Sequence, residues 1–156
     1  TILRFSTVYG LSPRIRFDLT VNEFVRELSL DRELQVFGQQ FWRPYCHVQD
    51  IVRAIQCVLQ SQPKAVHCEI FGVGDTRENY TKEMIVDEIQ KIVPSGRIQF
   101  VQKDEDPRDY RVNFEKISKD LGFCVSKRLS DGIKEINQIL QDGLLTNPDS
   151  EVYRNC

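Results

Sequence analysis

The sequence opens on Thr1-Ile2-Leu3-Arg4-Phe5-Ser6-Thr7-Val8-Tyr9-Gly10, a run whose first nine residues are rich in β-branched, aromatic and other apolar side chains. This composition predicts a strand over 1–9, and the turn residues from Gly10 to Pro13 predict its end. A second β-rich run, 68–73, is closed by Gly74. Both runs are typical of central strands in a parallel sheet, yet too few other strands are expected to flank them. We therefore expect the chain to be a fragment of a longer protein, or to self-associate.

Between these strands, apolar residues recur every three to four positions, which predicts amphipathic helices. The helical stretches are 18–30, 48–59 with Pro63 as its stop, 81–93, a short one ending at Leu121, and 129–140. Short strands are expected at 34–37, 41–48 and 98–101. Strands that alternate with helices indicate the α/β class. Residues 1–142 are expected to form the folded part, and 143–156 a polar tail that is frayed.

Helix boundaries are expected from capping residues. Thr81, Asn113 and Ser130 each precede an apolar stripe and are expected to be N-caps. Asp18 is interpreted as a cap in preference to a catalytic acid, and Gly122 lies where a left-handed residue would end a helix.

Composition narrows the function classes. The formal net charge is −2 and 28% of residues are charged, which argues against nucleic acid as the main partner. No apolar run approaches the roughly 20 residues that span a bilayer. The five cysteines contain no Cys-x-x-Cys pair and there are only two histidines, so we expect reduced thiols, a cytoplasmic location and no metal site.

One candidate site is the aromatic stretch 37–50, which contains Arg43. A planar guanidinium suits a phosphate, and aromatic neighbours suit a sugar or base. The alternative, favoured by spacing alone, is that Trp42 and Tyr45 belong to the core and Arg43 pairs with Asp50. His47 is interpreted as structural.

A second candidate is the charged loop 104–111, which contains Arg108. Alone it is best explained as a solvated loop with local ion pairs, but an Arg108 that faces Arg43 would form a two-sided diphosphate site. The Gly-x-Gly at 72–74 lacks the third glycine of a dinucleotide turn, so we expect a strand end where backbones approach closely. Glu78 and Glu83 are expected at the surface.

Four ordered motifs carry a resemblance: Leu3-Arg4-x-x-x-Val8-Tyr9-Gly10, Arg43-Pro44-x-x-His47-Val48-x-Asp50-Ile51, Phe71-x-Val73-Gly74 and Arg108-x-Tyr110-x-Val112-x-x-x-Lys116-Ile117. From Thr1 to about Leu140 the chain resembles the extended short-chain dehydrogenases/reductases, above all the NAD-dependent nucleotide-sugar epimerases and dehydratases. The resemblance implies the carboxy-terminal part of an NAD(P)-binding Rossmann fold: the last sheet strands, 1–9 and 68–74, and a small α/β substrate-binding domain. Three positions depart from the family pattern, Leu11, Pro44 and Gly72.

The resemblance also implies a site. Arg43 and Arg108 would bind the diphosphate of a nucleoside-diphosphate sugar from two sides, with Tyr110 among the substrate-binding residues. Asn22 would lie near the phosphates or the sugar. Gln35, Val36 and Phe37 would lie along the nucleoside, partly through backbone groups. Tyr9 and Gly10 would lie at the nicotinamide end of NAD or NADP. Arg14 and Arg16 are further candidates for contact with the sugar or phosphate, although solvated side chains are the favoured alternative for both.

Two elements of the family are absent from the sequence: its Gly-x-x-Gly-x-x-Gly turn, and its Tyr-x-x-x-Lys pair. We therefore expect no catalytic residue in this chain, no activity from it alone, and a cofactor bound mainly by a missing amino-terminal half. The full protein, expected to be a cytoplasmic homodimer, would oxidise a sugar hydroxyl, usually at C4, before epimerisation, dehydration or reduction. Two alternatives stay open: a non-catalytic relative that senses dinucleotides or acts as a scaffold, and an unrelated α/β interaction domain.

Overall fold

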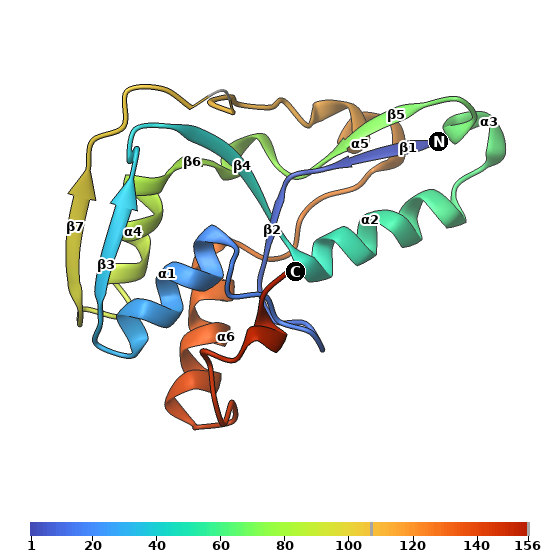
Figure 1. Ribbon diagram of the computed structural model, residues 1–156. Coiled ribbons are helices and arrows are strands. Elements are labelled where there is room, and N and C mark those ends of the chain that lie inside the picture. The colour runs from blue at the N-terminus through green and yellow to red at the C-terminus, as the bar shows by residue number, and fades with distance from the viewer. Residues whose placement is uncertain (107, 156) are drawn as a thin grey trace.

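The structure, a computed structural model, describes residues 1–106 and 108–155. Strands and helices alternate along most of the chain, which confirms the α/β class (Figure 1). The elements are β1 (Ile2–Phe5), β2 (Thr7–Tyr9), α1 (Thr20–Ser29), β3 (Glu33–Phe37), β4 (Trp42–His47), α2 (Val48–Gln60), α3 (Pro63–Val66), β5 (Ile70–Val73), β6 (Asn79–Thr81), α4 (Lys82–Gln90), β7 (Arg97–Val101), α5 (Glu115–Leu121) and α6 (Leu129–Gln141), with short 3-10 helices at Thr76–Glu78 and Glu151–Tyr153.

The strands form three small groups. β1 pairs with β5 in parallel, β3 pairs with β7 in parallel, and β4 lies between β2, which is parallel to it, and β6, which is antiparallel. The expected single strand over 1–9 is therefore divided at Ser6. There the backbone N–H and the hydroxyl of Ser6 both donate to the Val73 carbonyl, at 3.2 and 2.7 Å, and the chain changes partner from β5 to β4.

The close backbone approach expected at Gly74 is confirmed. A β-carbon on Gly74 would lie 2.5 Å from the Ser6 hydroxyl and 2.9 Å from the Phe114 ring, so only glycine fits between these two segments.

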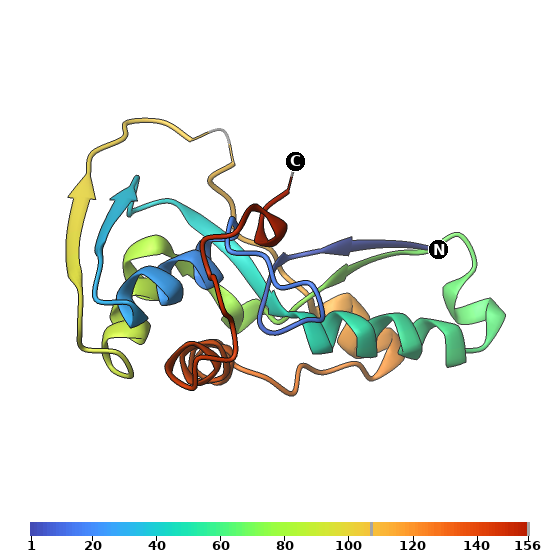
Figure 2. The ribbon, with the colours of Figure 1, turned by 60° about the horizontal axis from the view of Figure 1, so that its bottom comes forward.

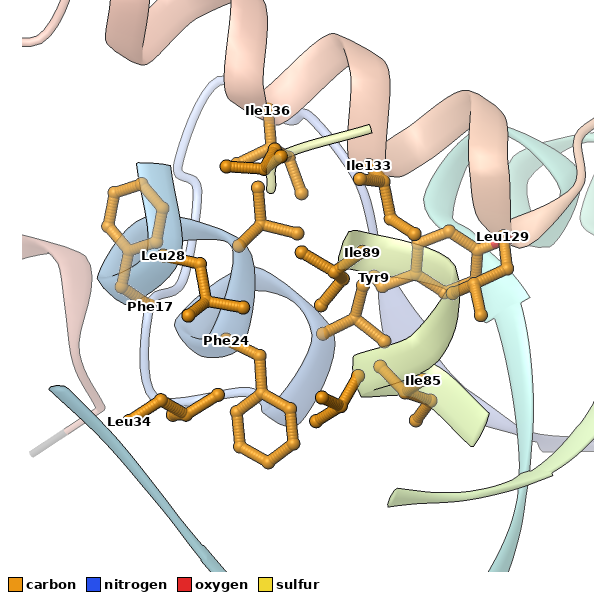
Figure 3. Packing of buried hydrophobic residues seen from close by; sticks show 14 of the residues in the cluster. Tyr9, Phe17, Phe24, Leu28, Leu34, Ile85, Ile89, Leu129, Ile133 and Ile136 are labelled. Atoms are coloured by element: carbon orange, nitrogen blue, oxygen red, sulfur yellow. The ribbon is translucent and has the colours of Figure 1, made fainter. Parts of the chain in front are cut away.

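The main core lies where α1, α4 and α6 meet. Figure 3 shows their apolar side chains interdigitating, with Tyr9 from β2 and Leu34 from β3 beside them. The predicted helical stripes account for most of this core, whose helical members are Val21, Phe24, Val25, Leu28, Ile85, Val86, Ile89, Leu129, Ile133, Ile136 and Leu140. Burial of these stripes is what stabilises helices of this length.

A smaller core lies under β5, between α2 and α5, and consists of Cys46, Ile51, Ala54, Phe71, Val73, Ile117 and Phe123. Around it, apolar side chains remain exposed, including Ile2 and Phe5 on β1 and Leu59 on α2. Among the described residues β1 has only one strand neighbour, as expected for this segment.

Two of the predicted caps are confirmed. The Thr81 hydroxyl accepts from the Met84 N–H at 3.2 Å at the start of α4, and Gly122 ends α5 with φ of +66°. Asn113 lies just before α5, and its side chain accepts from the Glu115 N–H at 2.8 Å.

Asp18 and Ser130 were wrongly expected to be caps. Asp18 forms an ion pair with Arg16, and α1 begins without a side-chain cap. At α6, Ser130 lies inside the helix, and the Asp131 carboxylate accepts from the Arg128 N–H at 2.8 Å instead.

The helix predicted over 48–59 is confirmed as α2, which ends at Gln60, ahead of Pro63. Pro63 is also the first residue of α3, where its missing N–H leaves no helical hydrogen bond unmade. One further expectation is corrected. Glu78, expected at the surface, is buried, and its carboxylate pairs with Arg128 at 3.0 Å. Burial raises the pKa of Glu78, and Arg128 opposes this rise without cancelling it.

The segment after α6 is folded against the domain. Figure 2 shows it running beside the loop that follows β2. The Tyr153 carbonyl accepts from the Phe17 N–H at 2.8 Å, and both nitrogens of the Arg32 fork donate to Asp149, at 2.8 and 2.7 Å. The expectation of a frayed tail was thus wrong for the described part; Cys156 lies outside the described residues.

None of the described helices is long and apolar enough to cross a membrane. The four cysteines described are free thiols.

Replacing Ile136 by alanine tests the main core. Ile136 is fully buried between helices, so the variant is expected to lose about 2–5 kcal/mol of unfolding free energy in urea titrations. Leu59→Ala, at a side chain that is 78% exposed, serves as the control and should change stability by no more than about 0.5 kcal/mol. Equal losses in the two variants would contradict this description of the core.

Candidate active site

Arg43 lies on β4 and pairs with a residue from a distant loop. Its Nη2 donates to Asp106 at 2.9 Å, and the two side chains are 13% and 4% exposed. The partner considered from the sequence, Asp50, is wrong. The pairing joins segments 63 residues apart, which no local pattern reveals.

Asp106 also contacts Arg108. Its carboxylate accepts from the Arg108 backbone N–H at 2.9 Å, and the Arg108 Nε lies 3.5 Å away. The Arg108 N–H lowers the pKa of Asp106, burial opposes this, and Arg43 adds to the lowering. One ionised carboxylate therefore lies between the two arginines, so the fold brings together the two residues expected to bind a diphosphate.

Tyr110 completes this cluster. Its ring lies 5.9 Å from the guanidinium carbon of Arg43, within cation–π range. Two hydrogen bonds fix the loop on β4: Tyr110 N–H donates to the Trp42 carbonyl at 3.2 Å, and Trp42 N–H donates to the Asp109 carboxylate at 2.7 Å.

Gln35 and Val36 on β3 point to opposite sides. Gln35 is exposed and bonds Gln99 across the strand pair, whereas Val36 is fully buried in the main core. Because side chains alternate along a strand, Val36 can meet a ligand only through its backbone, while Gln35 and Phe37 share the outer face.

Sequence reasoning missed Lys82, the first residue of α4. Its ammonium donates to the Phe37 carbonyl at 2.6 Å, at the end of β3. A lysine directly after a capping threonine gave no local signal, because its neighbours come from other strands.

A second group of predicted residues gathers at the end of β2. The Asn22 side chain accepts from the Gly10 N–H at 3.0 Å and donates to the Arg16 carbonyl at 2.9 Å. These residues, with Tyr9 and Arg14, line a pocket of about 230 Å³. Arg16 pairs with Asp18, and Arg14 donates to the Arg154 carbonyl at 3.3 Å, so both have protein partners.

The Tyr9 side chain belongs to the core. It is 1% exposed, its hydroxyl has no partner among the described residues, and burial raises its pKa. Gly10 has φ of +101°, and a β-carbon there would lie 2.2 Å from the His47 ring. Only backbone groups of this turn can therefore approach a cofactor.

His47 has the structural role expected. Its Nδ1 accepts from the Gln49 N–H at 3.2 Å, so in the neutral ring Nε2 has the proton and donates to Glu135 at 3.0 Å. The histidine thereby caps α2 and connects it to α6.

Asp50, fully buried, fixes the loop before α6. Its carboxylate accepts from the backbone N–H groups of Ser126 and Lys127, the Ser126 hydroxyl and Arg53, over 2.6–3.0 Å. Burial acts to raise its pKa, but these hydrogen bonds outweigh burial and the pKa is lowered. In the part of the chain that the structure describes, no group of three or more His, Cys, Asp or Glu could hold a metal ion.

A comparison with known families covers the first three of the four motifs on which the resemblance rests. A sequence profile described as the NAD dependent epimerase/dehydratase family matches residues 1–74, the segment that contains Tyr9-Gly10 and Arg43. The matched segment is a little under half of the chain.

Solved structures, among them two 4-epimerases, match nearly the whole chain. UDP-glucuronic acid 4-epimerase from Bacillus cereus, in complex with UDP-glucuronic acid and NAD, gives a TM-score of 0.76 at 23% identity, over 91% of this chain and 45% of that one. UDP-glucose 4-epimerase from Thermotoga maritima, with UDP-glucose, gives 0.74 at 23% identity, over 92% and 46%. RMD from Pseudomonas aeruginosa, complexed with NADPH, gives 0.72 at 14% identity, over 90% and 48%.

At these identities the likeness shows a shared fold. It confirms the expected Rossmann-type α/β architecture, and the likeness extends past residue 74. The chain spans a little under half the length of these structures.

Removing the Asn22 side chain tests the turn at Gly10. Asn22→Ala leaves the Gly10 N–H and the Arg16 carbonyl without this partner, so we expect a loss of about 1–3 kcal/mol and faster hydrogen exchange at the Gly10 amide. Gln138→Ala, which removes an exposed contact with Asp142, is the control. Unchanged exchange at Gly10 would rule out the proposed anchoring.

The contribution of the Asp50 carboxylate to folding stability should depend on pH in the acid range. Because its folded-state pKa is lowered, its stabilisation is present above its ordinary pKa of 3.8 and is lost as the pH falls through the folded value. Urea midpoints measured down the acid range should fall less steeply in Asp50→Asn, which should also be less stable at neutral pH. Parallel pH profiles for the two proteins would contradict this.

Proposed function

We propose that this chain is the nucleotide-sugar-binding part of an NAD-dependent epimerase or dehydratase, with Arg43 and Arg108 binding the diphosphate. One observation carries the proposal: the ionised Asp106 carboxylate already lies between these arginines, with direct donors from both residues. The gap between them therefore suits an anionic group.

Arg43 and Arg108 both keep guanidinium N–H groups that could donate to a phosphate. Arg43 uses only Nη2 on Asp106, and the Arg108 side chain is 73% exposed with its Nε 3.5 Å from that carboxylate. A guanidinium has five N–H donors in a planar fork, so both arginines can add charge-assisted bonds to phosphate oxygens.

The nucleoside would lie beside the cluster. Gln35, Phe37 and Tyr110 are exposed, and they offer an amide and two rings close to Arg43 or to the end of β3. Relatives of this fold have been crystallised with UDP-glucuronic acid and UDP-glucose, which supports UDP as the nucleotide.

The sugar would extend toward the pocket that Gly10 and Asn22 line. The chain's own task would be to orient the sugar hydroxyl, usually that at C4, since orientation supplies much of the rate gain in such reactions. NAD or NADP would accept hydride from that carbon in the full protein, before epimerisation, dehydration or reduction.

The residues of this chain do not fit the dinucleotide itself. The sequence contains no Gly-x-x-Gly-x-x-Gly turn, the Gly10 N–H already donates to Asn22, and the Tyr9 hydroxyl is buried. The proposal therefore assigns the cofactor site and the Tyr-x-x-x-Lys pair to residues outside this chain, and expects no activity from the chain alone. Dimerisation and a cytoplasmic location stay predictions.

Calorimetric titration of the full-length protein with UDP tests the proposal. Each of Arg43→Ala and Arg108→Ala removes a charge-assisted donor and should weaken binding about ten-fold or more. Arg111→Ala is a matched control: Arg111 comes from the same loop but lies 4.8 Å over the Trp42 ring, on the opposite face of β4 from Arg43.

Wild-type affinity in both arginine variants would contradict the diphosphate site. Absence of binding to UDP, GDP, CDP and dTDP, with binding of a nicotinamide dinucleotide, would favour the non-catalytic relative.

A further inference from the structure

Lys82 directly follows β6, the strand that pairs with β4 and so with the segment that carries Arg43. β4 and β6 are antiparallel, with Arg43 opposite Tyr80 and Trp42 opposite Thr81. Alternation along a strand places Tyr80 and Arg43 on one face, and Lys82 is the second residue after Tyr80, at the point where β6 continues into α4.

The position of the Lys82 ammonium is fixed by the backbone around it. Its Nζ donates to the Phe37 carbonyl at 2.6 Å, and the next residue, Glu83, donates its N–H to the Gln39 carbonyl at 3.2 Å. The start of α4 is thus attached to the turn between β3 and β4. An ammonium has three donors, and the Phe37 carbonyl takes one of them.

Among the described residues, no carboxylate lies within 4.0 Å of the Lys82 ammonium. Asp106 forms its ion pairs with Arg43 and Arg108 instead. Burial lowers the pKa of Lys82; the cations Arg43, Lys103 and Arg108 add to the lowering, and only Asp106 opposes it among the strongest charged neighbours. Lys82 therefore has more cationic than anionic groups among its strongest charged neighbours. Such an excess of positive charge in a half-buried position favours an incoming anion.

We infer that Lys82 is a third cationic residue of the diphosphate site and binds a phosphate oxygen next to Arg43. It would connect that phosphate to the Phe37 carbonyl at the end of β3, where the nucleoside is proposed to lie. This inference rests on the proposed function, and it adds a residue outside the four motifs that suggested the site.

The test compares UDP, uridine and inorganic pyrophosphate as titrants of the full-length wild-type protein and of three variants. Lys82→Met keeps an unbranched apolar stem and removes the charge, and Lys82→Arg restores a charge. Lys91→Met removes an exposed lysine, paired with Glu88, from the other end of α4. Thermal unfolding of each variant checks that it is folded.

Lys82→Met should weaken UDP and pyrophosphate about ten-fold or more and leave uridine unchanged. Lys82→Arg should recover most of the UDP affinity, and Lys91→Met should bind like the wild type. UDP affinity within two-fold of wild type in Lys82→Met, or an equal loss for UDP and uridine, would overturn the inference while leaving the proposed function intact. A wild type that binds neither UDP nor pyrophosphate would overturn both.

Discussion

The contact between Tyr9, Gly10 and His47 is the constraint on which the rest of this structure depends. β2 and β4 are paired in register Tyr9 to His47, and the two rings meet edge to face at 5.4 Å. Glycine is required on both sides, because a β-carbon on Gly10 would meet the His47 ring and one on Gly132 would lie 2.6 Å from the Tyr9 ring. His47 then caps α2 and bonds α6 through Glu135, so one histidine fixes two strands and two helices. This arrangement also positions the turn at Gly10, which lines the pocket shared with Asn22.

The helices could be predicted from the sequence because their signals are local. An apolar stripe and its cap lie within a few residues of one another. Thr81 and Gly122 both have their predicted capping positions in the structure. Two of the failures involve partners far along the chain: Glu78 pairs with an arginine 50 residues away, and the short strand β6 pairs with β4. The third is local, because Asp18 pairs with Arg16 two residues away instead of capping a helix.

The candidate site also contains residues that sequence motifs identified and contacts that they did not. Arg43 and Arg108 were found by motif, and their shared carboxylate shows that the fold brings them together. Asp106 was not assigned that role, since Asp50 was nearer in sequence. Val36 is instructive because a signal existed: apolar Leu34 and Val36 alternate with Gln35, which indicates a buried side chain. Strand alternation should therefore outweigh a family-based contact when the two disagree about a side chain.

The pairing of strands also has a consequence for the order in which this chain acquires its structure. Ile2 pairs with Ile70 and Leu34 with Ile98, so each of these two-stranded units joins segments more than sixty residues apart. Closing such long loops precedes any gain from strand pairing, and folds dominated by contacts of this kind reach the native state slowly. During synthesis β1 must wait until β5 has been made, and its apolar residues Ile2 and Phe5 stay without their native neighbours during that interval. The helices α1 and α2 are complete before β5 is made, whereas α5, which packs on β5, is made after it.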